Sequence, residues 1–127
     1  GGIADSRGYR ASFALGAKGV QIGTCLIASK ECIAHEIYKK TICEVDDTST
    51  SLVNLGRMQV RALRTPMVER VLEGAKQLSF SDFTQKNVEA AWVKGELDAF
   101  PIAAGQIAGM IKEIKSVRQI IEGIVAE

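Results

Sequence analysis

Two glycine-containing turns, about twenty residues apart, constrain this chain more than any other feature. Gly1-Gly2-Ile3 opens the sequence, and Gly23-Thr24 follows a helical pattern over residues 7–17 and a β-branched run over residues 19–24. The order turn, helix, strand, turn is the repeating unit of a parallel α/β sheet or barrel. The sequence therefore predicts an α/β fold in which both turns emerge next to each other on one face.

These two turns are candidates for binding a phosphate group. Glycine leaves backbone N–H groups uncovered, so a phosphate oxygen can approach them closely. Thr24 adds a hydroxyl donor, and the start of the following helix adds partial positive charge. A pair of tight turns without any ligand explains the spacing alone more simply, so that alternative stays open at this point.

The rest of the chain has mainly helical periodicity. We expect no second sheet after residue 28, and residues 52–63 are ambiguous between helix and strand. Capping signals at Ser29, Asp82 with Gln85, and Ser116 with Gln119 mark expected helix starts, and Pro66 suits another. The expected helices cover residues 30–45, 67–78, 82–95 and 116–125.

Composition excludes several classes of protein. A net charge of +1 gives no electrostatic case for binding nucleic acid or an anionic membrane, and the apolar runs are too short to span a bilayer. The three cysteines form no Cys-x-x-Cys pair, and a single histidine excludes a multi-histidine metal centre. We expect a cytoplasmic protein without a metal site or a disulfide framework.

Four segments together resemble the nitronate monooxygenase family, also called the 2-nitropropane dioxygenases. Gly-Gly-Ile-Ala-Asp-Ser-Arg-Gly (1–8) is similar to the motif that follows the seventh barrel strand, and residues 14–24 are similar to the next family motif. Residues 30–39 and 104–109 also look like family segments. The related enoyl-ACP reductase II enzymes share these motifs.

The resemblance implies a (β/α)8 TIM barrel of which this chain is the C-terminal portion, from the strand-seven turn onward. Residues 1–28 would be the last β-α-β unit, and residues 29–127 a C-terminal helical region. Carried over by position, the residues that would bind FMN through its phosphate are Gly1, Gly2, Gln21, Ile22, Gly23 and Thr24. Two residues depart from the family pattern: Ser6 stands where glycine is usual, and Cys25 stands where arginine is common.

The resemblance places the catalytic histidine upstream of this chain, so we expect no catalytic residue here and an inactive protein if these 127 residues are made alone. The expected full-length enzyme is an FMN-dependent oxidoreductase that oxidises nitronates with oxygen. The alternatives are an enoyl-ACP reductase II, which takes electrons from NAD(P)H, and an incomplete chain that only binds phosphate or self-associates. The expected partner is a small-molecule substrate, a nitronate or an enoyl thioester, and the barrel is a candidate homo-oligomer.

Other notable side chains have simple structural explanations. We expect His35 to be a surface or packing histidine and Trp92 to be a core residue. We expect Cys25 to be a buried thiol, and Arg7 to be either solvated or near a phosphate. Gln106 lies in a glycine-rich stretch that would cover the flavin or start a helix. An arginine series over residues 57–70 is explained by ion pairs, or by docking of an acidic carrier protein if the enzyme is an enoyl reductase.

Overall fold

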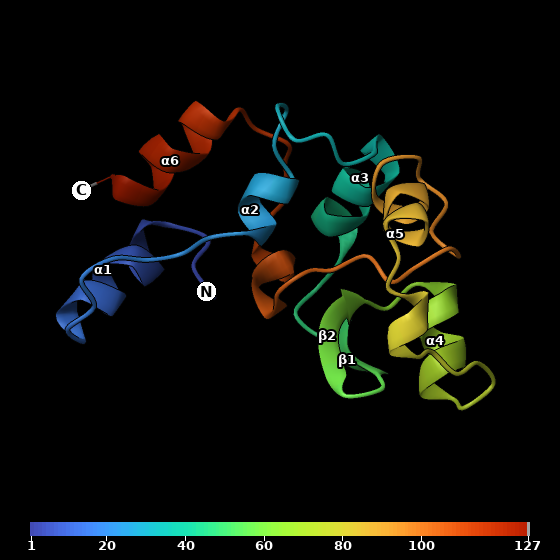
Figure 1. Ribbon diagram of the computed structural model, residues 1–127. Helices are drawn as coiled ribbons and strands as arrows, with labels where there is room; N and C mark the ends of the chain where they lie inside the picture. Colours follow the sequence, from blue (N-terminus) through green and yellow to red (C-terminus); the bar gives the residue numbers. More distant parts are fainter. Residues whose placement is uncertain (127) are drawn as a thin grey trace.

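The computed structural model describes residues 1–126, and it divides into two regions (Figure 1). The first, called the arm here, consists of residues 1–27 together with residues 113–126. The second, called the lobe, consists of residues 28–112. The arm contains three helices: α1 (Ser6–Ala14), α2 (Thr24–Ile27) and α6 (Val117–Val125).

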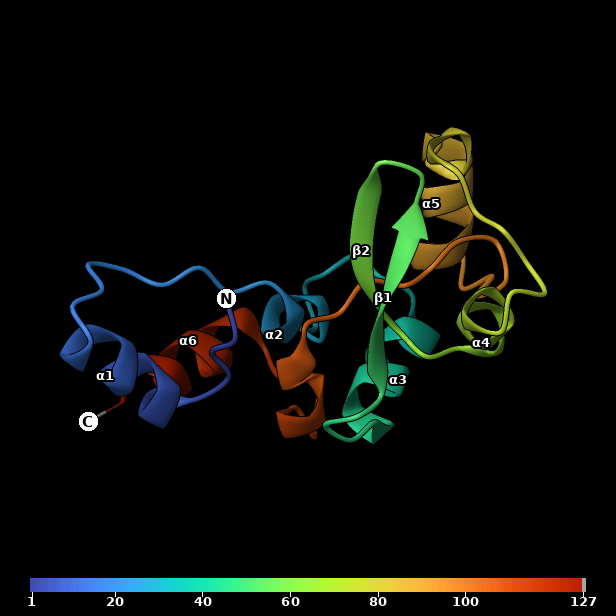
Figure 2. The same ribbon diagram turned by 90° about the horizontal axis from the view of Figure 1, so that it is seen from below.

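Two well-capped helices form most of the arm. The Asp5 carboxylate accepts hydrogen bonds from the N–H groups of Arg7 and Gly8 and so caps α1. Ser116 and Gln119 form the predicted capping box at the start of α6. The two helices pack together at one end of the molecule (Figure 2) although they lie about a hundred residues apart in sequence. Helix α6 therefore lies next to α1.

The strand expected over residues 19–24 does not form in this chain. Residues 19–23 belong to no strand, and α2 begins at Thr24. Figure 1 shows this segment as the long link from α1 to α2. A strand needs a neighbouring strand for its backbone hydrogen bonds, and within residues 1–126 nothing pairs with this segment.

The lobe contains a β-hairpin, so the expectation of no second sheet was wrong. Strands β1 (Thr50–Leu55) and β2 (Met58–Leu63) pair antiparallel, with Thr50 opposite Leu63 and Leu55 opposite Met58. Gly56 has a φ of +68°, which suits the first position of a two-residue turn. The turn residue Gly56 between two β-rich runs was the sequence signal for this hairpin.

The lobe helices start later or end earlier than periodicity predicts. They are α3 (Glu36–Glu44), α4 (Pro66–Leu72) and α5 (Gln85–Trp92), with 3₁₀ turns η1 (Phe80–Asp82) and η2 (Gln106–Met110). Pro66 does begin α4. The caps of the other two differ from the prediction: α3 is capped by His35 rather than Ser29, and α5 by Thr84 rather than Asp82.

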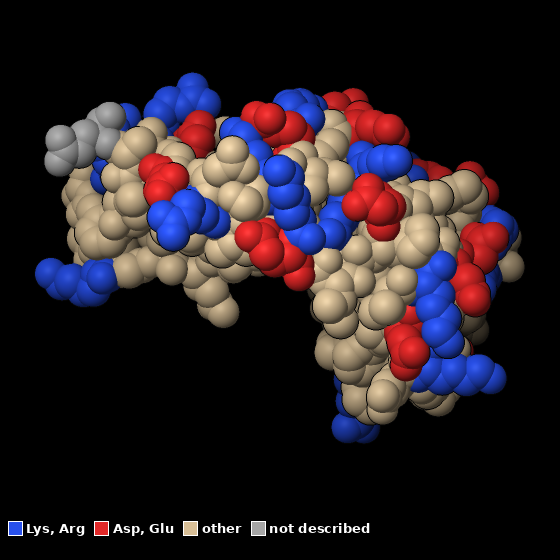
Figure 3. All heavy atoms as spheres, turned by 90° about the horizontal axis from the view of Figure 1, so that it is seen from above, with Lys and Arg blue, Asp and Glu red and all other residues tan. Residues whose placement is uncertain are grey.

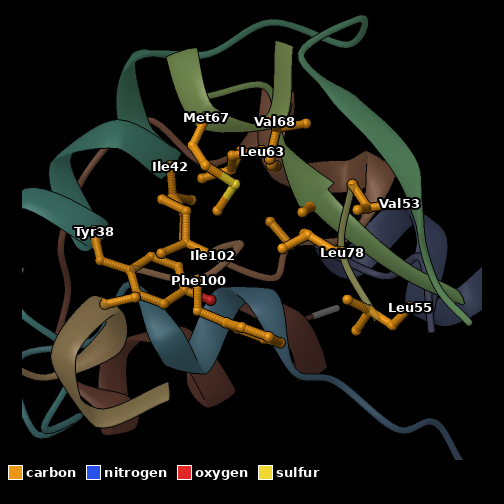
Figure 4. Packing of buried hydrophobic residues seen from close by; sticks show 14 of the residues in the cluster. Tyr38, Ile42, Val53, Leu55, Leu63, Met67, Val68, Leu78, Phe100 and Ile102 are labelled. Carbon is orange, nitrogen blue, oxygen red and sulfur yellow. The ribbon is translucent and has the colours of Figure 1, made fainter. Parts of the chain in front are cut away.

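A single apolar core holds the lobe together, and its buried residues all lie between 28 and 108. It includes Tyr38, Ile42, Leu55, Phe100 and Ile102, which converge from α3, the hairpin and the segment after α5 (Figure 4). The segment 102–104 lies along β2, because Leu63 N–H donates to Ile102 O and Ala104 N–H donates to Arg61 O. That segment is thereby fixed in place at the junction with the arm.

None of the helices in the described residues 1–126 is long and apolar enough to cross a membrane.

Candidate functional site

The two predicted turns meet in the structure. The Cys25 thiol donates a hydrogen bond of 3.5 Å to the carbonyl oxygen of Ile3, which ties the turn before α1 to the start of α2. Ala4, Asp5 and Cys25 also line one cavity of about 240 Å³, which α6 closes on another side. The prediction that the two turns lie next to each other is therefore confirmed, whereas the sheet or barrel face on which they were expected does not form within residues 1–126.

The first turn is open backbone. Gly1 and Gly2 are exposed, and Gly2 has a φ of +78°, a conformation that L side chains rarely adopt. No other atom lies within 4 Å of the position that a Cβ would take at either residue. The shape of the turn thus favours glycine at Gly2, and the side of its backbone where a Cβ would lie is uncovered.

The second turn is also uncrowded, but its glycine does not have a positive φ. Gly23 is the N-cap of α2 with a φ of −132°, so its conformation lies outside the left-handed region. A Cβ there would meet nothing within 4 Å in residues 1–126. Neither the shape of the backbone nor a neighbour in this chain requires a glycine, whereas a ligand that approaches the backbone would require one.

The backbone donors of this turn are uncommitted. Among residues 1–126, the N–H groups of Gly23 and Thr24 donate to no protein acceptor, as expected for the first groups of a helix. Gln21 is exposed and Ile22 is half-buried just before them. The segment therefore presents a short row of free donors and one amide side chain.

Thr24 connects the second turn to the lobe. Its Oγ1 accepts a hydrogen bond of 2.9 Å from the N–H of Gly105, which begins η2. Within the described residues the Thr24 hydroxyl donates to no acceptor, so its proton remains available. No local sequence signal could have revealed this contact, because the two residues lie 81 positions apart.

The two departures from the family motif have structural explanations. Ser6 is the first residue of α1 and its φ is not positive, so it introduces no backbone strain where glycine is usual. Cys25 is buried, and burial raises the pKa of its thiol. A raised pKa opposes thiolate formation, which supports the prediction of a buried structural thiol rather than a nucleophile.

Arg7 is engaged with a neighbour rather than with the open turns. Its guanidinium lies 2.6 Å from the Asp5 carboxylate, and this hydrogen bond holds the pKa of Asp5 below its usual range. In Figure 3, basic and acidic side chains lie next to one another along part of the visible face, beside broad areas without charged residues. Because the Arg7 guanidinium is paired with Asp5, backbone dipoles would contribute to holding an anion at the turns.

The remaining candidates are structural. The Trp92 indole donates to Pro101 O and packs against the core, as predicted. His35 accepts from Ile37 N–H through Nδ1, and its ring fills the space above Gly95. Two members of the arginine series form ion pairs, Arg64 with Glu69 and Arg70 with Asp98.

Comparisons with known proteins identify the family of this chain. A probable nitronate monooxygenase of Bacillus subtilis is 29% identical over all of this chain and 38% of its own length. A probable nitronate monooxygenase of Staphylococcus saprophyticus is 46% identical over 55 residues, 43% of this chain and 16% of its own length. The structure of FabK from Thermotoga maritima superposes with a TM-score of 0.81 and 39% identity, over 98% of this chain and 41% of that chain.

The chain thus spans less than half the length of the relatives it matches. The similarity to FabK shows that this portion shares the fold of the corresponding part of that enzyme. The family model for nitronate monooxygenase matches residues 1–127. The chain therefore belongs to the nitronate monooxygenase family, a family of oxidoreductases.

Proposed function

We propose that this chain is the C-terminal part of an FMN-dependent (β/α)8-barrel oxidoreductase, and that its two turns hold the FMN phosphate. The observation that carries the proposal is the pair of free backbone N–H groups at Gly23 and Thr24, at a glycine that no neighbour in the described residues crowds. The free N–H groups of Gly23 and Thr24 point to an anionic ligand. In barrels, the turns after strands seven and eight often form a phosphate site.

The residues present fit a phosphate group. The second turn offers two backbone donors and the Thr24 hydroxyl proton, while the first offers the uncovered backbone of Gly1 and Gly2. Gln21 and Ile22 complete the segment that leads into the turn. When bound, FMN supplies the electron-transfer chemistry, and the protein supplies binding, orientation and exclusion of water.

Cys25 stands at the position where arginine is common in the family, so this chain has no cation there. Because Cys25 donates to Ile3 O, it fixes the distance between the two turns without adding charge. The phosphate would then be neutralised only by backbone dipoles and donors from this chain. We expect FMN affinity to depend strongly on turn geometry and little on ionic strength.

For the reaction, we propose oxidation of nitronates with oxygen, on the basis of the family to which the chain belongs. A second candidate is the NAD(P)H-dependent reduction of an enoyl thioester by an enoyl-ACP reductase II. It is favoured by the 39% identity with FabK over almost the whole chain. The residues that act on the substrate would lie in the part of the enzyme that precedes residue 1.

One pair of assays on the full-length protein separates these reactions. Oxygen uptake that depends on added nitronate supports the first, and NAD(P)H consumption that depends on an enoyl thioester supports the second. A flavin absorption band that survives desalting is expected in both cases. A full-length protein that retains no flavin and catalyses neither reaction would contradict the proposal.

A further inference from the structure

We propose that Thr24 is a positioning residue that couples the occupied phosphate turn to the η2 segment of the lobe. The inference rests on the proposed function, since it needs an anion at the Gly23-Thr24 turn. It goes further by assigning one hydroxyl two simultaneous hydrogen bonds. One is seen in the structure, and the other would be made to the phosphate.

The first hydrogen bond is the contact between Gly105 N–H and Thr24 Oγ1, at 2.9 Å. The fit is close, because a Cβ on Gly105 would lie only 3.2 Å from Thr24 Oγ1. Gly105 is therefore a residue that allows the lobe to approach the turn. Among the described residues, this hydrogen bond joins the Gly23-Thr24 turn directly to the start of η2.

The lobe side of this contact is held by hydrogen bonds and close packing. Ala104 N–H donates to Arg61 O, and the Tyr38 hydroxyl donates to Ala103 O. Further along, Gly109 packs so closely on the backbone of Asp46 and Asp47 that a Cβ there would lie 2.6 Å from it. The N–H of Gly105 is thus presented to Thr24 by a segment that is held on both sides.

The second hydrogen bond would use the Thr24 hydroxyl proton, which has no acceptor in residues 1–126. A hydroxyl that accepts one hydrogen bond becomes a stronger donor for the next, because the bonds polarise one another. A row from Gly105 N–H through the Thr24 hydroxyl to a phosphate oxygen therefore strengthens both contacts. Phosphate binding should stabilise η2, and with it the exposed side chain of Gln106 at its first position.

The test is hydrogen exchange by mass spectrometry on the full-length protein, with and without FMN, for peptides that cover residues 20–28 and 101–111. In the wild type we expect FMN to slow exchange in both peptides. Thr24→Val keeps the shape but removes the hydroxyl, so it should abolish the slowing in 101–111 and weaken FMN binding about ten-fold. Thr24→Ser should restore both effects.

Thr41→Val is the matched control, because the Thr41 hydroxyl bonds only within its own helix, to Ile37 O. It should leave FMN affinity and both exchange patterns unchanged. If FMN slows exchange in 20–28 but not in 101–111 of the wild type, the coupling is wrong and the phosphate site stands. If FMN slows neither peptide, the coupling and the proposed function both fall.

Discussion

The lobe and the arm are built from the same chain but are stabilised in different ways. Every buried residue of the main apolar core lies in the lobe, whereas α1 has no buried residue at all. In the arm only Cys25 and Ile124 are buried apolar residues, and Leu15 is 90% exposed. A region can thus carry the recognisable motifs of a family while it lacks the packing that would hold it in place.

This difference in packing indicates that the lobe provides most of the folding stability and that the arm provides the candidate binding site. The lobe has what an independently folded unit needs, a core with satisfied polar groups. The arm has two uncrowded glycine turns and an extended segment that pairs with no strand in the described residues. Both features suit a binding site that is completed by other parts of the full-length enzyme and by a ligand. We therefore expect mutations in the lobe to act on folding, and mutations in the arm to act on cofactor binding.

The largest difference should come from truncation of a matched pair of phenylalanines. Phe100 is 1% exposed and packs on Phe83, so Phe100→Ala should destabilise the lobe by about 3–5 kcal/mol. Phe13 in α1 is 40% exposed, and Phe13→Ala should lower the free energy of unfolding by less than about 1 kcal/mol. Denaturant titration of the 127-residue chain, followed by Trp92 fluorescence, measures both. Equal losses would mean that the two regions share one core.

A pair of tyrosines gives the next contrast. The Tyr38 hydroxyl is buried and donates to Ala103 O, so Tyr38→Phe leaves that carbonyl without its donor and should cost about 1–3 kcal/mol. Tyr9 in α1 packs on Phe13, and its hydroxyl has no partner in the described residues. Tyr9→Phe should leave the unfolding midpoint unchanged. A neutral Tyr38→Phe would show that the Ala103 carbonyl is solvated.

Glycines with positive φ separate folding from binding. Gly56→Ala forces a side chain into a left-handed turn of the hairpin and should cost about 1–2 kcal/mol of stability. Gly2→Ala introduces the same strain in the arm, where it should leave lobe unfolding unchanged and weaken FMN binding by the full-length protein. Thermal denaturation and flavin fluorescence titration test the two effects. Loss of lobe stability in Gly2→Ala would contradict the separation.

The smallest effect concerns the cap of α1 and its dependence on pH. The hydrogen bond from Arg7 lowers the pKa of Asp5 in the folded state, so its contribution is complete above the unfolded pKa and is lost as pH falls through the folded one. Asp5→Ala should destabilise α1 by about 1 kcal/mol at neutral pH and by nothing in strong acid. Far-ultraviolet circular dichroism of the chain and its variant, across acidic pH, would show a constant difference if this reasoning is wrong.

The sequence revealed the arm better than the lobe. The turn at Gly2, the helix start at Pro66 and the Ser116 capping box were recognisable because each depends on the local backbone and its neighbours in sequence. The hairpin was missed because its two strands gain their stability from each other and from the core, which local propensity does not report.

Contacts between distant residues were also beyond prediction. The Gly105 contact with Thr24 depends on how the lobe sits against the arm. The strand expected at 19–24 was wrong for the same kind of reason: the segment has the right residues, but strand formation depends on a neighbour that the described residues do not include.

The central claim is that the arm binds the phosphate of FMN, and the ratio of FMN to riboflavin affinity tests it most directly. Riboflavin lacks the phosphate, so the full-length wild type should prefer FMN strongly. Gly23→Ala places a methyl group where ligand oxygens would approach and should remove most of that preference. Gly19→Ala is the matched control: its Cβ also meets nothing within 4 Å, but it lies at the other end of the extended segment. A collapse of the FMN preference in Gly23→Ala alone is the predicted result, and an unchanged preference in that variant would contradict the account.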